Sequence, residues 1–249
     1  MSSISLVVIA FNEAEKIERC LKSAMNVVDE MIVVDSGSTD GTVAICERLG
    51  ARVFHQPFLG YIEQKNFAAS LAASEYILSL DADEALSQHL VIWLEQARQS
   101  GLTYDAYVFN RLNNYCGSWI KHGDYYPDKK LRLWRKEKGY WGGENPHDKV
   151  IALPGTTVAR IKHDILHWSF ASRPEHKAQM IRFSEIAARA MHEKGKRVGA
   201  AKPFLSAAWA FVNGFILKAG FLDGINGFHI AVMNAFYSFR KYTLLRSCY

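Results

Sequence analysis

The fold is decided by the stretch Tyr76-Ile77-Leu78-Ser79-Leu80-Asp81-Ala82-Asp83-Glu84, in which a short apolar run ends in a cluster of acids. Five residues of strand-forming character between polar neighbours predict a strand buried in a parallel sheet. The acids would then follow the carboxyl end of that strand. If the chain stays extended for two residues beyond Leu80, alternation places Asp81 and Asp83 on the same side.

Two carboxylates on one side of a strand end could hold a hard divalent cation. Oxygen ligands at this spacing suit Mg²⁺ or Mn²⁺ better than zinc. Such ions keep several waters and are completed by substrate phosphates, so a metal-diphosphate site is the first hypothesis. The alternative is a solvated first turn of a helix, because helical spacing follows around Leu90, Trp93 and Leu94.

Strand and helix patterns alternate along the first 80 residues. Strands are expected over residues 4–10, 31–34, 53–54 and 76–80, with helices over residues 14–25, 43–49 and 62–73. Asn12 is expected to cap the first helix, with Glu15 in the capping-box position. This alternation with short connections predicts an α/β fold with a single, mostly parallel central sheet flanked by helices.

Ligands in such sheets bind at the carboxyl ends of the strands, and three acidic loops are expected there. They are residues 11–13, 35–42 and 81–84. The loop at 35–42 lacks the lysine of a P-loop and the spacing of a dinucleotide-binding turn, which disfavours a phosphate cradle. Asp35 at this strand end is instead suited to accept hydrogen bonds from a base or a ribose. Ser38 or Asp40 is expected to cap the next helix.

Three motifs resemble the inverting glycosyltransferases of family 2. They are Val-Val-Ile-Ala-Phe-Asn-Glu ending at Glu13, Val-Val-Asp-Ser-Gly-Ser-Thr-Asp-Gly-Thr around Asp35, and Leu-Asp-Ala-Asp-Glu ending at Glu84. Three further segments resemble the branch with lipopolysaccharide core β-glucosyltransferases: Gln64-Lys65-Asn66, Pro146-His147-Asp148 and His167-Trp168-Ser169. The resemblance covers residues 4 to about 195 and implies the A-type nucleotide-sugar glycosyltransferase fold.

The resemblance implies roles for individual residues. Nucleotide-sugar binding would fall to Asn12, Glu13, Asp35, Lys65 and Asp81. The metal would be held by Asp83, aided by Asp81 and by His167. An inverting transfer needs one carboxylate as general base beside the acceptor hydroxyl. Asp148 is the candidate for that base that the resemblance implies. In this branch the corresponding His is commonly followed by Glu, whereas this chain has the shorter Asp148, so Glu144 is kept as the second candidate.

Composition bounds the remaining possibilities. A chain of 249 residues that is 49% hydrophobic and 22% charged can bury a full core, as one α/β domain or one domain plus an appendage. Its four cysteines have no metal-binding spacing, and Cys20 and Cys46 fall on inward faces of predicted helices, which favours reduced core thiols in the cytosol. The N-terminus enters a strand directly and predicts no secretory signal.

The net charge of +5 is concentrated in the C-terminal region, where residues 195–249 carry seven basic residues and one acid. A basic surface confined to an apolar, aromatic tail favours an anionic membrane surface and argues against nucleic acid. After a long amphipathic helix over residues 172–194, two helices are expected over 204–222 and 225–239. The interior Asn213 and Lys218 make spanning a bilayer costly, so the helices are expected to lie in the interface. The alternative is that they pack on the catalytic domain or form a dimer interface.

These expectations give a catalytic domain over residues 1–170 and a helical, membrane-associated region over residues 171–249. The expected activity is a metal-dependent transfer of a hexose, glucose from UDP-glucose first, to a lipid-linked saccharide such as the lipopolysaccharide inner core. The enzyme would lie on the cytoplasmic face of the cell membrane. Three alternatives stay open: a family 2 transferase with another sugar or a polyprenyl-phosphate acceptor, a nucleotidyltransferase, and a membrane-attached saccharide-binding protein.

Overall fold

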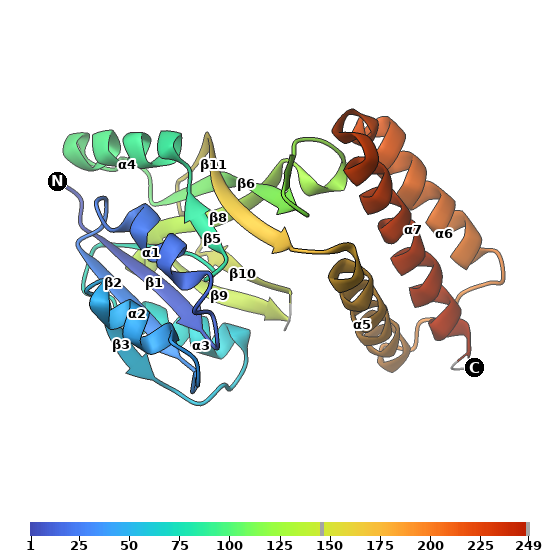
Figure 1. Cartoon of the computed structure of the whole chain (residues 1–249), viewed down its shortest axis with the longest axis horizontal. Coiled ribbons are helices and arrows are strands. Elements are labelled where there is room, and N and C mark those ends of the chain that lie inside the picture. The colour runs from blue at the N-terminus through green and yellow to red at the C-terminus, as the bar shows by residue number, and fades with distance from the viewer. Residues whose placement is uncertain (145–146, 248–249) are drawn as a thin grey trace. The chain divides into compact units, whose positions relative to one another are not determined.

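The computed structural model describes residues 1–144 and 147–247, and the side chains of Glu144 and His147 lie outside that description (Figure 1). The chain forms two compact units. Unit 1 comprises Met1–Arg111 and Lys129–His167, and unit 2 comprises Leu112–Asp128 and Trp168–Tyr249. Unit 2 therefore includes residues 112–128, which fall within the first of the two predicted domains.

Four parallel strands form the first half of the sheet in unit 1, in the order β3-β2-β1-β4. Their bounds are β1 Ile4–Ala10, β2 Glu30–Asp35, β3 Arg52–His55 and β4 Tyr76–Ser79. Between them run α1 Ile17–Ala24, α2 Thr42–Arg48 and α3 Tyr61–Ser70. The predicted alternation of strand and helix is confirmed over this part of the chain.

The prediction of a mostly parallel sheet is wrong beyond β4. The order continues β8-β6-β11-β5, with β8 antiparallel to β4, β5 antiparallel to β11, and β7 paired with β6. These strands are β5 Glu84–Leu86, β6 Ala106–Tyr115, β7 Ser118–Ile120, β8 Asp128–Arg135 and β11 Val158–Phe170. Strands joined without a crossover helix pair antiparallel, and no α-helix separates β6, β7 and β8, so the sheet is mixed.

A separate two-stranded antiparallel sheet is formed by β9 Gly139–Glu144 and β10 His147–Ala152. The glycines and charged residues between Trp141 and Asp148 predict a polar loop, and this prediction is wrong for residues 141–144 and 147–148, which lie in the two strands. Trp141 explains the difference, because it is buried, lies opposite Val150 and packs into the core.

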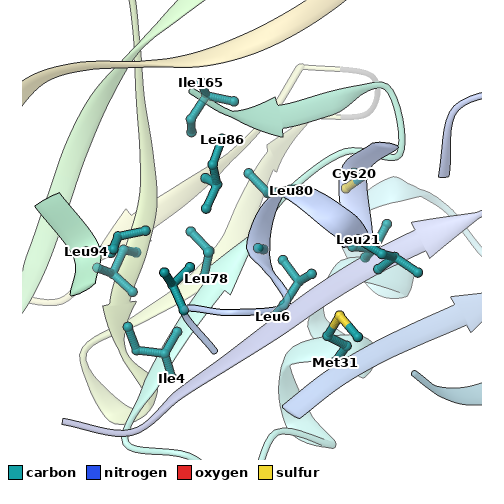
Figure 2. Close-up of a cluster of buried hydrophobic side chains, with 14 of the residues drawn as sticks. Ile4, Leu6, Cys20, Leu21, Met31, Leu78, Leu80, Leu86, Leu94 and Ile165 are labelled. Carbon is teal, nitrogen blue, oxygen red and sulfur yellow. The ribbon is translucent and has the colours of Figure 1, made fainter. Parts of the chain in front are cut away.

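Alternating side chains of the central strands build two cores, one on each face of the sheet. Figure 2 shows the first, in which Ile4, Leu6 and Leu78 gather with Leu21 of α1 and with Leu94 of the helix α4 (Gln88–Ser100). The second core lies on the other face and joins Val7, Ile32, Ile77, Ala68, Trp134 and Trp141. This second core packs α3 and β9 together, and α3 carries Lys65.

Unit 2 consists of the helices after β11 together with residues 112–128. Its helices are α5 Arg173–Glu193, α6 Lys202–Phe211 and α7 Gly224–Ser247, with a π-helical turn over Val212–Leu217 and a 3₁₀ turn over Gly220–Asp223. The α6–α7 hairpin closes tightly at Gly227, where an added Cβ would lie 1.9 Å from the carbonyl oxygen of Gly220.

Acidic side chains explain why residues 112–128 belong to unit 2. Asp223 accepts hydrogen bonds from the backbone N–H groups of Lys121 and His122. Asp124 accepts from Lys218 Nζ at 2.7 Å and from Asn234 Nδ2 at 3.1 Å. Within the described residues, no single helix is long and apolar enough to span a membrane, and only the pair 202–217 and 220–247, bent by 74°, meets that criterion together.

Candidate active site

The loops that follow β1 and β2 are joined by hydrogen bonds. The backbone N–H of Asn12 donates to Ser38 Oγ at 2.8 Å, and Thr39 N–H donates to Asn12 Oδ1 at 2.9 Å. Asn12 has a positive φ of 54°, which asparagine tolerates better than most residues. Asn12 therefore does not cap α1, which begins at Ile17 without a side-chain cap, and the capping-box prediction is wrong.

Asp35 and Glu13 lie on this pair of loops. Asp35 is buried, and its Oδ2 accepts hydrogen bonds from the N–H groups of Gly37 and Ser38, both at 2.9 Å. The N–H of Glu13 donates to Thr42 Oγ1, and its carboxylate lies 3.0 Å from Lys16 Nζ. The structure thus brings Asn12, Glu13 and Asp35 to one edge of the sheet, where nucleotide binding was predicted for them.

Asp81 lies between two buried cations. Its Oδ1 lies 2.8 Å from Lys65 Nζ, and its Oδ2 accepts from Arg132 Nη2 at 2.6 Å. Burial by itself would raise the pKa of the Asp81 carboxyl, but the charges of Arg132 and Lys65 together hold that pKa well below its usual range. Asp81 is consequently an anion fixed by protein partners.

Glu84 is fully buried and completes the same network. Its Oε1 accepts from Arg132 Nη2 at 2.7 Å and lies 3.2 Å from Arg111 Nη1, and its Oε2 accepts from the N–H of Asp81 at 3.0 Å. Residues 84–86 form β5, and α4 is capped by Ser87. The alternative interpretation of the acidic cluster as the first turn of a helix is therefore wrong.

Asp83 faces His167 across the pairing of β5 with β11. The register sets His167 opposite Glu84, and His167 Nε2 lies 3.4 Å from Asp83 Oδ2. One carboxylate and one imidazole can supply two ligands to a divalent cation whose other positions are taken by water and phosphate oxygens. Among the described residues, no group of three or more His, Cys, Asp or Glu side chains could hold a metal. Asp83 and His167 therefore fit an ion whose remaining ligands come from water and a substrate, and they do not fit a site made of protein ligands alone.

Lys65 brings Asp148 to the acidic turn. Its ammonium lies 2.7 Å from Asp148 Oδ2, 2.8 Å from Asp81 Oδ1 and 4.2 Å from the centre of the Trp141 ring. The Lys65 side chain is only 7% exposed, which places this contact inside the protein. The structure thus joins three of the predicted site residues. The side chain of Glu144, the second candidate for the base, lies outside the described residues.

Arg132 and Trp141 belong to this cluster although no sequence motif pointed to them, and Glu84, which ends one of the quoted motifs, had no individual role predicted for it. A signal for Arg132 was present, because it alternates with apolar residues in Leu-Arg-Leu-Trp on β8 and a buried arginine requires acidic partners. Two buried donors of the cluster, Arg132 Nε and Trp141 Nε1, have no hydrogen-bond acceptor among the described residues. Unpaired buried donors are uncommon in folded proteins and indicate capacity for an oxygen-bearing ligand.

Known proteins resemble this chain along almost its whole length. The lipopolysaccharide core biosynthesis glycosyltransferase LpsC of Rhizobium meliloti is 25% identical to this chain over 95% of it and 89% of LpsC. The solved structure of the mannosyltransferase PcManGT from Pyrobaculum calidifontis, in complex with GDP-Man and Mn²⁺, matches 98% of this chain and 87% of that one with a TM-score of 0.59 and 15% identity. That likeness supports an A-type glycosyltransferase fold with a mixed sheet flanked by helices.

Two further findings define the family. An uncharacterized glycosyltransferase of Rickettsia felis is 33% identical over 99% of this chain and 90% of its own length. The family model of glycosyl transferase family 2 matches residues 5–151, which is more than half of the chain. The chain therefore belongs to glycosyl transferase family 2.

Proposed function

We propose that this glycosyltransferase is inverting and metal-dependent, and that it transfers a hexose, glucose from UDP-glucose in the first instance, to a lipid-linked saccharide. The observation that carries the proposal is the contact of Lys65 with both Asp81 and Asp148, which brings an acidic strand end and a candidate base together. The similarity to LpsC, a lipopolysaccharide core biosynthesis glycosyltransferase, supports a lipopolysaccharide core saccharide as the acceptor, and we propose the inner core.

In this proposal the loops around Asn12, Glu13 and Asp35 hold the nucleoside. Asp83 and His167 hold a Mg²⁺ or Mn²⁺ ion, as the pairing of carboxylate and imidazole permits. When bound, such an ion offsets the negative charge that develops on the departing diphosphate. The mannosyltransferase of similar fold was solved with GDP-Man and Mn²⁺, which supports a divalent ion as the cofactor.

The proposed base is Asp148. Its carboxylate takes the proton of the acceptor hydroxyl as that oxygen attacks the anomeric carbon from the side opposite the leaving group, which inverts the configuration. Lys65 holds this carboxylate in place through a contact of 2.7 Å between its ammonium and Asp148 Oδ2. Glu144 is the alternative base.

The proposed acceptor is lipid-linked because unit 2 carries an exposed apolar surface beside basic residues. The side chains of Leu205, Trp209, Leu217 and Ile225 are each more than 60% exposed. Apolar patches of this kind on a helical hairpin bind lipid interfaces, and lysine and arginine add attraction to anionic headgroups. We propose that the enzyme lies on the cytoplasmic face of the cell membrane, where anionic lipids attract basic residues.

The experiment that tests the activity is turnover with a panel of nucleotide-sugars in the presence of Mn²⁺, with analysis of the released nucleotide. Release of a nucleoside diphosphate together with an inverted glycoside is the expected result. Release of pyrophosphate would instead favour a nucleotidyltransferase. Binding of saccharide without any turnover of the panel would favour a saccharide-binding protein.

A further inference from the structure

Lys65 is the residue through which the candidate base is attached to the rest of the site. Its ammonium lies between Asp81 Oδ1 at 2.8 Å and Asp148 Oδ2 at 2.7 Å, with the ring of Trp141 at 4.2 Å. The side chains of both acids are more exposed than that of Lys65, at 28% for Asp81 and 12% for Asp148 against 7% for Lys65. The Lys65 side chain is thus more enclosed than either of the two acids that it contacts.

The hairpin that carries Asp148 is not part of the large sheet, so contacts from outside must fix its position. The helix α3 supplies them through consecutive residues. Asn66 donates from Nδ2 to the carbonyl oxygen of Trp141 at 2.7 Å and accepts from the N–H of Trp141 at 2.9 Å, which fixes β9. Lys65 contacts Asp148 on β10. The two residues therefore hold both strands of the hairpin.

The same helix is attached to the loop after β2. Gln64 is fully buried, and its Nε2 donates to Ser36 Oγ at 2.9 Å and to the carbonyl oxygen of Gln56 at 2.8 Å. Residues 64–66 consequently connect three segments that are far apart in the sequence: the loop after β2, the acidic turn and the β9–β10 hairpin.

We propose that Lys65 is a positioning residue that fixes Asp148 at a set distance from Asp81, so that the base faces the acceptor once the donor is bound. This inference rests on the proposed function, in which Asp148 is the base. It differs from direct donor binding by Lys65, because an ammonium held by two carboxylates has its charge already compensated. A compact ammonium fits between two carboxylates, whereas the planar guanidinium of arginine requires a wider gap.

The test is a double-mutant cycle with Lys65→Met and Asp148→Asn, in which methionine keeps the apolar stem and removes the charge. Lys65→Met should lower kcat about 10- to 100-fold, because small misplacement of a catalytic group costs factors of this size. In the Asp148→Asn background the same change should lower kcat by less than about threefold, since residues that act through one another are not additive. Lys65→Arg should recover part of the lost rate.

Two further measurements separate positioning from other roles. Calorimetry with the donor and Mn²⁺ should give a dissociation constant for Lys65→Met within about threefold of wild type, because Arg132 still holds Asp81 at 2.6 Å when Lys65 is replaced. Lys136→Met is the matched control, because Lys136 Nζ donates to the carbonyl oxygens of Ser70 and Ala72 at the other end of α3. It should leave kcat unchanged.

Additive losses of kcat in the cycle, or a donor affinity weakened more than about tenfold by Lys65→Met, would overturn the proposal and favour a donor-binding lysine. Thermal melts of wild type, the two single variants and the double variant test the contact without an activity assay. The fall in Tm of the double variant should be smaller than the sum of the two single falls, and additive falls in Tm would also overturn the proposal. If wild type turns over no nucleotide-sugar while the melts show this coupling, the proposed function fails and the contact between Lys65 and Asp148 stands.

Discussion

Replacing Arg132 with Met should cost this protein a large share of its stability. Arg132 is only 3% exposed and lies 2.6 Å from Asp81 and 2.7 Å from Glu84. Without it, the fully buried Glu84 keeps only the longer contact of 3.2 Å with Arg111 among its cationic partners in the described residues. Breaking one side of a buried ion pair in this way costs about 3–5 kcal/mol of unfolding free energy.

The assay is equilibrium unfolding in urea of wild type, Arg132→Met, Glu84→Gln and the double variant. The loss of unfolding free energy in the double variant should be smaller than the sum of the two single losses. The difference should be about 1–3 kcal/mol, because the two residues share one network. If Arg132→Met lowers the unfolding free energy by less than about 1 kcal/mol, the buried network of Arg132, Asp81 and Glu84 is refuted as a source of stability, because exposed ion pairs contribute that much.

The same variants should differ in their response to acid. The pKa of Asp81 in the folded protein lies below its unfolded value, so its contribution to stability is present at neutral pH and disappears as the pH falls from about 4 through the folded pKa. Of the positive charges that lower the pKa of Asp81, Arg132 has the largest effect and Lys65 a smaller one, and Arg132→Met removes the largest. Its stability should therefore fall less steeply between about pH 4 and pH 2 than that of wild type, and an unchanged slope would contradict the assigned cause.

Three further predictions concern the base, the tail and a buried histidine. Asp148→Asn should keep donor binding and lower transfer by about 10²–10⁴-fold, as expected for a general base, and normal transfer by Asp148→Asn with loss in Glu144→Gln would move the base to Glu144. Trp209→Ser with Leu217→Ser should reduce sedimentation with vesicles containing anionic phospholipid, whereas equal sedimentation of wild type and variant would argue that the hairpin does not bind lipid. His176 is fully enclosed beside Tyr115 and Tyr125, and burial together with His229 lowers its pKa to about 4. Because the unfolded histidine titrates near 6.5, the free energy of unfolding should decline by about 2–3 kcal/mol as the pH falls from 6.5 to 4, and His176→Gln should remove that decline in urea unfolding.

The elements that sequence predicts best are those with one dominant local signal. The apolar run at residues 4–10 forms β1 over those same residues, and the amphipathic stretch at 172–194 forms α5 from Arg173 to Glu193. Both depend on periodicity that is complete within the segment. The acids at the ends of β1, β2 and β4 could be placed at one edge for the same reason, because parallel order follows from the intervening helices.

The remainder depends on partners that are distant along the chain. β5 has only three residues and pairs with β11 some 80 residues away, so its local sequence resembled a helix start. The hairpin of β9 and β10 is rich in Gly and charged residues, and its position depends on Asn66 and Lys65 of α3. Arg132 has no visible role until β8 is known to lie beside β4.

The central claim is that acids from separate strand ends form one site for a metal-bound nucleotide-sugar. Isothermal titration of UDP-glucose into wild type and Asp83→Ala, each with Mn²⁺ and with EDTA, tests it most directly. The account predicts binding by wild type that requires Mn²⁺ and is lost in Asp83→Ala. Equal binding in EDTA, or unchanged Mn²⁺-dependent binding by Asp83→Ala, would contradict it.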